Sequence, residues 1–404
     1  MNVIVRPSRL CGEIAALPSK SQAHRMLICA ALAGEDTLIG CRSAGQDMDA
    51  TTRCLRALGA KIVCDEKGYH VSPIDKAAEN AVLDVGESGS TLRFLLPVVC
   101  ALGVNATFVL HGRLAQRPLE PLWSELLRCG AQLTRGESTI HVSGCLTGKD
   151  YTLAANVSSQ FLSGILMALP ILGGGSLTME GKLESEGYLN MTVEALRRFG
   201  ISIKRTENTF HVPSGPLKSI GACIVEGDWS NAAFWLCAEA IGGMPLKVTG
   251  LDPASPQGDR TVTEAIREIR KGNAVLDCSQ IPDLVPPLAV LAALTPGTTR
   301  FAGAGRLRLK ESDRITACVQ LLRSLGGEAE ELPDGFIVEG KTKLRGGCVD
   351  SFGDHRIAMA AAIAAAGCEE EIKIQNPQAV EKSYAAFWQD YCRLGGCITW
   401  EEAI

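Results

Sequence analysis

The feature of this sequence that most constrains its fold is a recurring pattern in which an apolar helical segment ends at a glycine and a short alternating stretch follows. Glycine just past a helix adopts the left-handed backbone conformation at little steric cost, and alternation of apolar and polar residues is typical of a strand. Short turns such as residues 66–68 (EKG) and 333–335 (PDG) then predict hairpins. Six copies in 404 residues predict six units of roughly 70 residues each. The recurring glycines are Gly59, Gly130, Gly200, Gly326 and Gly395, with a weaker copy at Gly272.

A second helix is expected in each unit, and its start combines Ser, Thr, Gly, Asp or Arg with a following apolar run. N-capping accounts for the Ser and Asp residues without any ligand. It does not account for cations, because a positive charge in the first turn opposes the helix dipole. Since a helix N-terminus and a cation together bind phosphates and carboxylates, the pattern predicts sites for small anions. The cations are Lys20, Arg25, Arg93, Arg314 and Arg356, and the segments are residues 19–32, 87–99, 156–169, 227–241, 310–322 and 353–366.

Net charge and apolar run lengths exclude several classes of protein. The formal charge is −5, so the chain lacks the basic excess of a protein that binds nucleic acid or an anionic membrane. No apolar run reaches the roughly 18 residues that a membrane-spanning helix needs, and residues 1–10 lack the apolar core of a signal peptide. We therefore expect a cytoplasmic protein with more than one domain.

The cysteines and most histidines do not form metal-binding patterns. The closest pair of the sixteen cysteines, Cys392 and Cys397, has the wrong spacing for a CxxC motif, which favours reduced cysteines that act as small apolar residues. Three histidines, His70, His141 and His211, occupy the same position in three repeats, which indicates repeat architecture. The roles of His24, His111 and His355 remain open.

Eight motifs, taken in order, resemble those of the 5-enolpyruvylshikimate-3-phosphate (EPSP) synthase family. The resemblance extends over nearly the whole chain, and it depends on the joint order and spacing of motifs that are each weak alone. They are residues 19–25 (SKSQAHR), 89–93 (GSTLR), 116–118 (QRP), 157–161 (VSSQF), 281–283 (IPD), 309–314 (LKESDR), 353–356 (GDHR) and 381–384 (EKSY).

The resemblance implies an α/β fold, a two-domain inside-out α/β barrel built from six βαβαββ-like repeats with helices inside and sheet outside. Residues 1–18 and 228–404 would form a discontinuous domain on the phosphoenolpyruvate side, and residues 19–227 a domain on the shikimate 3-phosphate side. The helix N-termini of both domains would face one cleft that closes on the substrates.

The activity that the resemblance implies is transfer of the enolpyruvyl group of phosphoenolpyruvate to the 5-hydroxyl of shikimate 3-phosphate, with release of phosphate. This addition–elimination belongs to the shikimate pathway of aromatic amino acid biosynthesis. The implied partners are these two small molecules, with no nucleic acid, membrane, cofactor or metal, and the implied state is a monomer. Glyphosate would bind at the phosphoenolpyruvate pocket, and Gly89 is the residue typical of sensitive members.

Three catalytic residues follow from the matched motifs. Asp283 would take the proton from the 5-hydroxyl, Glu311 would deliver and remove the methylene proton, and Lys20 would contact both substrates. Each has an alternative interpretation. Asp283 could cap the following helix, Glu311 could form a surface ion pair with Arg314, and Lys20 could be a solvated lysine.

The remaining site residues follow from the same resemblance. The phosphoenolpyruvate-binding residues would be Lys20, Gly89, Arg117, Gln160, Arg314, Arg356 and Lys382. The shikimate 3-phosphate-binding residues would be Lys20, Ser21, Arg25, Ser158, Ser159, Gln160, Ser185, Tyr188, Asp283 and Lys310. Each serine could instead be an ordinary helix cap. Arg93 and His355 would border the site without a role in proton transfer.

The sequence departs from the family pattern at several positions. Pro18 is followed directly by Ser19, which makes the first connection between domains one residue short. Glu87, Ser90 and Phe94 stand where Asn, Thr and Pro are common in the family, and we expect Glu87 to meet a neighbouring Arg or Lys. Arg306 stands where some members carry an Asn.

Two alternatives of different kinds make different demands on the sequence. The first is the related transferase that uses UDP-N-acetylglucosamine, which has a Lys-Asn pair and a loop cysteine; here Ser21 follows Lys20, and residues 111–118 contain no cysteine. The second is a non-catalytic phosphate-binding protein, or an RNA-end-processing relative. A non-catalytic binding protein would be expected to have lost Asp283 or Glu311. An RNA-end-processing protein would be expected to have a basic surface.

Overall fold

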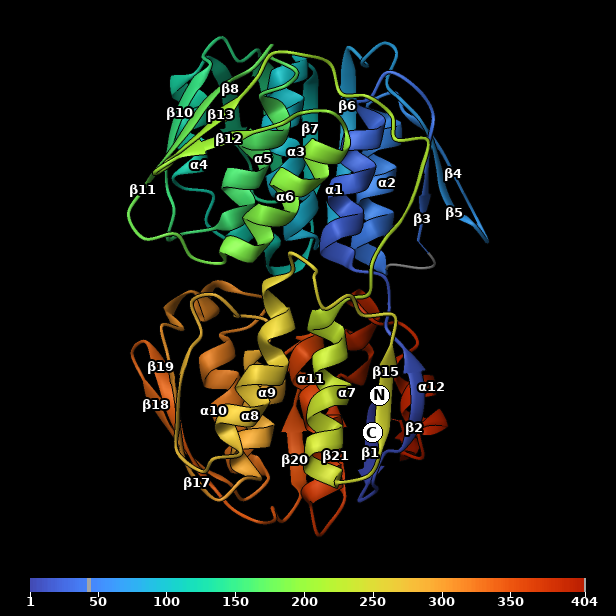
Figure 1. Ribbon diagram of the computed structural model, residues 1–404, viewed down its shortest axis with the longest axis vertical. Helices are drawn as coiled ribbons and strands as arrows, with labels where there is room; N and C mark the ends of the chain where they lie inside the picture. Colours follow the sequence, from blue (N-terminus) through green and yellow to red (C-terminus); the bar gives the residue numbers. More distant parts are fainter. Residues whose placement is uncertain (42–44, 403–404) are drawn as a thin grey trace. The chain divides into compact units, whose positions relative to one another are not determined.

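The computed structural model describes residues 1–41 and 45–402, and the chain divides into two compact units (Figure 1). Unit 1 consists of Met1–Leu17 and Gly227–Ile404, and unit 2 of Pro18–Glu226. The chain therefore passes between the units twice. The first strand, β1 (Asn2–Arg6), pairs with β21 (Ile372–Gln375) and β22 (Cys397–Glu401), which joins the N-terminal segment to the C-terminal part of the chain.

Sheets enclose helices in unit 2. Its described part has three four-stranded sheets, in the orders β14-β3-β5-β4, β6-β7-β9-β8 and β10-β11-β13-β12. In each sheet a parallel pair continues into an antiparallel hairpin. The strands are β3 (Thr37–Gly40), β4 (Lys61–Asp65), β5 (Gly68–Ser72), β6 (Asn80–Gly86), β7 (Asn105–Leu110), β8 (Ala131–Arg135), β9 (Thr139–Gly144), β10 (Asp150–Ala154), β11 (Gly175–Glu180), β12 (Lys204–Thr206), β13 (Thr209–Val212) and β14 (Ala222–Ile224).

The inner helices of unit 2 are buried on nearly every side. They are α1 (Lys20–Ala31), α3 (Gly89–Leu102) and α5 (Ser159–Ala168). Helices α3 and α5 are predominantly apolar, as enclosed helices usually are, whereas α1 also buries the polar side chains of Gln22, His24 and Arg25. The other helices are α2 (Gln46–Ala57), η1 (Gly112–Gln116), α4 (Leu122–Arg128) and α6 (Glu186–Arg198).

Unit 1 has the same arrangement with one incomplete copy. Its inner helices α7 (Trp229–Gly242), α9 (Val285–Ala293) and α11 (His355–Ala364) pack against one another. The described part of unit 1 has two four-stranded sheets, β16-β17-β19-β18 and β20-β21-β1-β22, and a two-stranded sheet, β15-β2. The other elements are β2 (Gly12–Ala15), β15 (Leu246–Thr249), η2 (Gly258–Thr261), α8 (Val262–Ile269), β16 (Ala274–Asp277), β17 (Gly297–Ala302), η3 (Gly305–Leu309), α10 (Arg314–Ser324), β18 (Glu328–Leu332), β19 (Gly335–Gly340), β20 (Gly347–Asp350), η4 (Ala365–Gly367), η5 (Pro377–Lys382) and α12 (Phe387–Arg393).

The repeated glycines lie where the pattern predicts. All six follow a helix and have positive φ, from 82° at Gly326 to 117° at Gly59. At Gly59 a side chain would also bring a Cβ to 2.8 Å from the carbonyl oxygen of Lys76. The prediction of an α/β fold built from repeated units, with helices inside and sheet outside, is confirmed.

Two details of the repeat prediction were wrong. The strand after Gly272, β16, does not begin a hairpin but pairs in parallel with β17. The copy of the repeat that contains Gly272 therefore has no hairpin within residues 250–300, all of which are described. The segment 310–322 is not an inner helix either. It forms α10, the helix that ends before Gly326, while the inner helix of that repeat is α9. The second error arose because apolar periodicity does not distinguish the two kinds of helix.

Candidate active site

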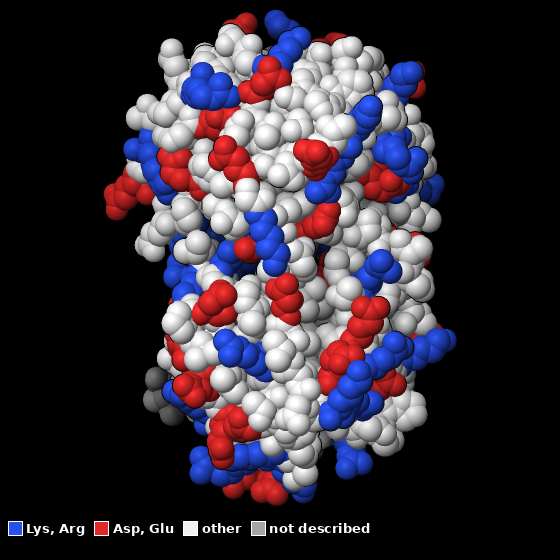
Figure 2. Space-filling view, turned by 60° about the vertical axis from the view of Figure 1, so that its left-hand side comes forward, with Lys and Arg blue, Asp and Glu red and all other residues white. Residues whose placement is uncertain are grey.

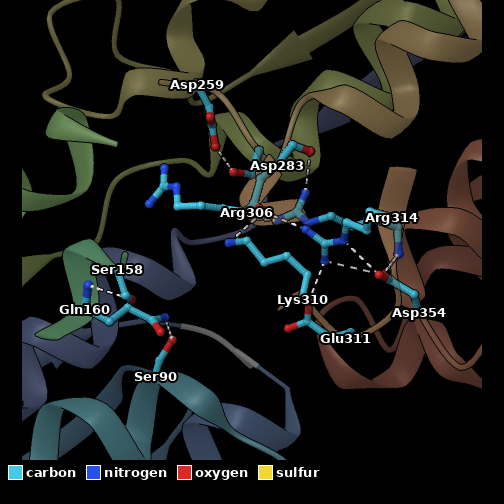
Figure 3. A network of polar contacts seen from close by, with 12 residues as sticks. Ser90, Ser158, Gln160, Asp259, Asp283, Arg306, Lys310, Glu311, Arg314 and Asp354 are labelled. Atoms are coloured by element: carbon cyan, nitrogen blue, oxygen red, sulfur yellow. Dashed lines mark hydrogen bonds and ion pairs between the residues drawn. The ribbon is translucent and has the colours of Figure 1, made fainter. Parts of the chain in front are cut away.

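Arg314 is the centre of a buried network of charges in unit 1 (Figure 3). Its side chain is only 2% exposed, and three carboxylates surround it. Nε donates to Asp354 Oδ2 at 2.7 Å, Nη1 to Asp283 Oδ1 at 2.8 Å and Nη2 to Glu311 Oε2 at 2.7 Å. A further long bond joins Nη2 to Asp354 Oδ1 at 3.4 Å. Four of the five guanidinium N–H groups are thus used by described residues.

Asp283 does not cap the following helix. The N-cap of α9 is Leu284, and no side-chain bond caps that helix. Instead, Asp283 Oδ2 accepts from Arg356 Nη2 at 3.1 Å, and its Oδ1 lies 3.9 Å from Lys310 Nζ as well as beside Arg314. Burial by itself raises the pKa of Asp283, but the charges of Arg356, Lys310 and Arg314 outweigh it and lower the pKa well below its usual range. Asp283 is therefore ionised and held among three cations.

Glu311 forms the ion pair with Arg314 that its alternative interpretation required, but this pair is not on the surface. Arg314 is buried, and Glu311 is 19% exposed. Glu311 and Asp283 also repel each other as like charges. This repulsion offsets a small part of the lowering of the Asp283 pKa by the three cations. The pair therefore belongs to the same network as Asp283.

Lys310 and Arg306 add positive charge beside Asp283. Burial lowers the pKa of Lys310 to about 8, with Asp283 opposing the shift and Arg314 adding to it. Arg306 also lowers this pKa, and its Nη2 donates to the carbonyl oxygen of Ser279 at 3.0 Å. Lys310 is thus a cation whose charge is lost just above neutral pH.

Asp354 was missed as a network residue by the sequence analysis. Its motif indicates a helix cap, which it is, because Oδ1 accepts from the backbone N–H of Arg356 at 3.0 Å at the start of α11. Its other contacts, with Ser312 Oγ at 3.1 Å and with Arg314, come from residues about 40 positions away and left no local sequence signal.

Lys382, the last expected residue of unit 1, lies at the end of η5, an element that packs against α11. The expected residues of unit 1 therefore come from the ends of η3, α10, α11 and η5 and from the segment before α9.

The expected residues of unit 2 lie at or near the starts of α1, α3, α5 and α6 and at the end of η1. Lys20, at the start of α1, is not a freely solvated lysine: its Nζ forms an ion pair with Asp47 Oδ2 at 2.9 Å. Asp47, in the first turn of α2, is a functional candidate that the sequence analysis missed, because an acidic residue there is ordinary helix chemistry.

Arg25 connects four helices. Its Nε donates to Thr192 Oγ1 at 2.6 Å, Nη1 to the carbonyl oxygen of Ser21 at 2.6 Å, and Nη2 to the carbonyl oxygen of Tyr188 at 2.9 Å and to Ser163 Oγ at 3.3 Å. Its guanidinium lies 4.7 Å from the ring centroid of Phe94. Burial lowers the pKa of Arg25 to about 10, so it stays charged at neutral pH. These four hydrogen bonds use four of the five N–H groups of the guanidinium.

Gln160 is oriented by two residues of α3. Arg93 Nη1 donates to the Oε1 of Gln160 at 2.8 Å. The Nε2 of Gln160 donates to Ser90 Oγ at 2.9 Å (Figure 3). Because Arg93 fixes which side of the amide is the oxygen, the amide nitrogen has a defined direction. Gly89 lies close to two guanidinium groups. A Cβ there would come within 2.7 Å of Arg117 Nη1 and 3.4 Å of Arg93 Nη1.

The serines of the expected phosphate site are at helix starts, as their capping alternative also requires. Ser158 is the N-cap of α5, and its Oγ accepts from the backbone N–H of Gln160 at 3.3 Å. Ser159 is the first residue of that helix. Ser185 precedes α6 with a left-handed φ of 55° and does not form a side-chain cap bond to that helix.

The short connection at Pro18 and Ser19 leaves the start of α1 intact. Ser19 is the N-cap, its Oγ accepts from Gln22 N, and its own backbone N–H donates to Glu226 O at 2.7 Å. In unit 1, the backbone N–H of Asp228 donates to Leu17 O at 2.7 Å. Within each unit, a backbone hydrogen bond therefore joins the two segments next to the crossings.

The open histidines and the remaining departures have different surroundings. His24 is buried against Thr51, which lowers its pKa to about 3, so it is a neutral core residue. His111 is exposed beside Asp84. Glu87 packs against Gly112, and its expected cation partner stays a prediction.

One face of the molecule carries charge of both signs. Figure 2 shows Lys and Arg interspersed with Asp and Glu on this face rather than gathered in a broad patch of one sign. Within residues 1–41 and 45–402, no helix is long and apolar enough to cross a membrane. The same residues contain no group of three or more His, Cys, Asp or Glu suited to hold a metal ion.

Comparison with known proteins identifies the family. A sequence model described as EPSP synthase (3-phosphoshikimate 1-carboxyvinyltransferase) matches residues 4–391. The 3-phosphoshikimate 1-carboxyvinyltransferase of Clostridium acetobutylicum is 40% identical over 422 residues, and that of Clostridium novyi 38% over 427, each match covering 98% of both chains. An EPSP synthase structure from Acinetobacter baumannii superimposes with a TM-score of 0.80 at 25% identity, over 99% of this chain and 100% of the other. This chain belongs to the EPSP synthase family.

Proposed function

We propose that this protein transfers the enolpyruvyl group of phosphoenolpyruvate to the 5-hydroxyl of shikimate 3-phosphate and releases phosphate. Full-length membership of the EPSP synthase family supports the reaction. The observation that carries the mechanism is the network in unit 1, where Asp283 and Glu311 lie among buried cations. Addition–elimination requires a proton acceptor, a proton donor and fixed positive charge, and this network contains all three types of group.

In the proposed mechanism, Asp283 accepts the proton of the 5-hydroxyl and Glu311 gives a proton to the methylene carbon. The hydroxyl oxygen bonds to the adjacent carbon, and the tetrahedral intermediate then loses phosphate while Glu311 takes back a proton from the new methyl group. The proton held by Asp283 leaves with the phosphate, which returns both carboxylates to their starting states. In the ligand-free protein Arg314 bonds both carboxylates, and the cations around Asp283 keep that residue ionised. An anionic group of phosphoenolpyruvate competes for the guanidinium of Arg314, and a carboxylate that it displaces loses a cation neighbour. Loss of a nearby cation raises the proton affinity of a carboxylate, which suits a group that carries a proton.

We assign the cations by their chemistry. Arg117, Arg314, Arg356 and Lys382 bind phosphoenolpyruvate, with Gly89 and Gln160 completing that pocket. An arginine suits this task because its planar fork matches carboxylate and phosphate groups bidentately. Lys20 serves both substrates, and Asp47 sets its position through their ion pair.

Shikimate 3-phosphate binds mainly to unit 2 in this proposal. Arg25 and Ser21 take its carboxylate, and Ser158, Ser159, Gln160, Ser185 and Tyr188 take its 3-phosphate, where helix starts favour an anion. Unit 1 adds Asp283 and Lys310. Residues of both units therefore act in one reaction.

The test is phosphate release from phosphoenolpyruvate by purified protein without added metal, with three acceptors in parallel. Shikimate 3-phosphate should support release, and unphosphorylated shikimate and UDP-N-acetylglucosamine should not. Release with UDP-N-acetylglucosamine would identify the related transferase instead. A folded protein that binds shikimate 3-phosphate but releases phosphate with none of the three would be a binding protein.

We also propose that the protein works in the cytoplasm as a monomer. All sixteen cysteines, each within the described residues, are free thiols, which suits a reducing compartment. Analytical ultracentrifugation would test the monomer, and a dimer at assay concentrations would refute it.

A further inference from the structure

Asp354 differs from the other carboxylates around Arg314 in burial and in what it holds. It is fully buried, whereas Asp283 and Glu311 are each 19% exposed. Its Oδ2 accepts from Arg314 Nε, the guanidinium nitrogen adjacent to the side-chain stem, at 2.7 Å, and its Oδ1 forms a longer bond with Nη2 at 3.4 Å. Asp283 and Glu311 form the short bonds to the two terminal nitrogens. The short bond to Nε can therefore orient the guanidinium while the short bonds of the terminal nitrogens change partners.

The same carboxylate also sets the start of α11. Its Oδ1 accepts from the backbone N–H of Arg356 at 3.0 Å, so it positions the residue that carries the second guanidinium at Asp283. Ser312 Oγ donates to Oδ2 at 3.1 Å, which ties this carboxylate to the segment before α10. One buried side chain therefore connects the segments that carry Arg314 and Arg356.

We propose that Asp354 is the positioning residue of the phosphoenolpyruvate site: it anchors Arg314 through Nε and Arg356 through its backbone, so that both guanidinium groups present their terminal nitrogens to one anion. Asp283 and Glu311 are exchangeable partners of Arg314, and Asp354 is the permanent one. Asp354 touches neither substrate. The inference rests on the proposed function, because it assumes that the anion is phosphoenolpyruvate.

The variant Asp354→Asn separates this role from helix capping. An Asn oxygen still accepts from the backbone N–H of Arg356, since Asn caps helices about as well as Asp, but the negative charge at Arg314 is lost. The matched control is Asp313→Asn. Asp313 caps α10, the helix that carries Arg314, through the backbone N–H of Thr316, and its side-chain partner Arg308 lies outside the Arg314 network.

Because hydrogen bonds between charged groups are among the stronger ones, Asp354→Asn should raise the KM for phosphoenolpyruvate about tenfold or more. The dissociation constant of shikimate 3-phosphate in calorimetry should stay within about twofold, since its main contacts are in unit 2. Asp313→Asn should change neither constant. Asp354→Ala should have the same effect on KM and also lower the melting temperature, because it removes the cap as well.

Three results would overturn the inference: an unchanged KM for phosphoenolpyruvate in Asp354→Asn, an equal loss for both substrates, or an equal KM rise in Asp313→Asn. A wild-type protein with no transferase activity would refute the proposed function instead. In that case crystal structures decide the anchoring itself. A reoriented Arg314 in Asp354→Asn would support it, and an unmoved Arg314 that keeps its bonds to Asp283 and Glu311 would refute it.

Discussion

Asp283 and Glu311 accept hydrogen bonds from two different terminal nitrogens of one guanidinium, that of Arg314, at 2.8 Å and 2.7 Å. The two carboxylates that the proposed mechanism uses as base and acid therefore share one cation. An anion that binds Arg314 would change the electrostatic surroundings of both. In the proposed mechanism, substrate binding and preparation of the acid and the base are in this way a single event.

The first prediction concerns the proton acceptor. Asp283→Asn keeps the size of the side chain but removes its basicity, so kcat should fall about 10²- to 10⁴-fold, the usual contribution of a general base. The KM values should change much less, because the lost function arises as the hydroxyl is deprotonated. Steady-state phosphate release with both substrates varied measures this, and thermal unfolding checks that the variant is folded. A kcat near that of the wild type would remove Asp283 as the base.

The repeat could be predicted because it depends on local chemistry. Each glycine after a helix has to adopt positive φ, and this requirement is visible in the sequence wherever an apolar helical pattern stops at Gly. The loss of the hairpin after Gly272 could not be predicted. The strand that follows has ordinary alternation, and its partner is decided by pairing with Gly297–Ala302 in another part of the sequence.

The site was predictable only as far as its residues carry local motifs. The family resemblance identified Asp283, Glu311 and Arg314 as site residues. It did not show that Arg314 bonds three carboxylates, because Asp354 lies 40 residues away from it in the sequence. The contact of Phe94 with Arg25 was invisible for the same reason. Asp47 was missed because acidic residues are common in first turns of helices whether or not they meet a lysine.

The second prediction uses the close approach at Gly89. A Cβ there would come within 2.7 Å of Arg117 Nη1, so Gly89→Ala displaces the end of a flexible side chain rather than the backbone. We expect a several-fold higher KM for phosphoenolpyruvate with little change in the affinity for shikimate 3-phosphate, since Arg117 is proposed to bind only the former. Gly34→Ala is the matched control, because a Cβ at Gly34 would meet nothing within 4 Å. Equal effects of the two variants would show that Arg117 is not what Gly89 protects.

The third prediction is a pH dependence. With its pKa near 8, Lys310 loses its positive charge as pH rises through that value, which weakens attraction for anionic substrates. The KM values should therefore rise above about pH 8. Lys310→Arg should keep the positive charge and shift the alkaline rise in KM to higher pH, because an arginine stays protonated.

Lys341→Arg is the control for that experiment, since Lys341 pairs with Glu328 on the surface of the same unit. Its profile should match that of the wild type. If KM still rises above about pH 8 in Lys310→Arg, a group other than Lys310 causes the pH dependence.

The last prediction concerns Phe94, a buried residue of α3. Its ring lies under the Arg25 guanidinium, and a desolvated cation–π contact of this kind contributes up to about 2 kcal/mol. Phe94→Leu keeps an apolar side chain but removes the aromatic face, so KM for shikimate 3-phosphate should rise about 3- to 30-fold while KM for phosphoenolpyruvate stays nearly constant. The control is Phe199→Leu, which removes another fully buried ring of unit 2. Both variants should lose stability in thermal unfolding, but only the first should weaken shikimate 3-phosphate binding. If both weaken it equally, loosened packing is the cause, and the ring does not position Arg25.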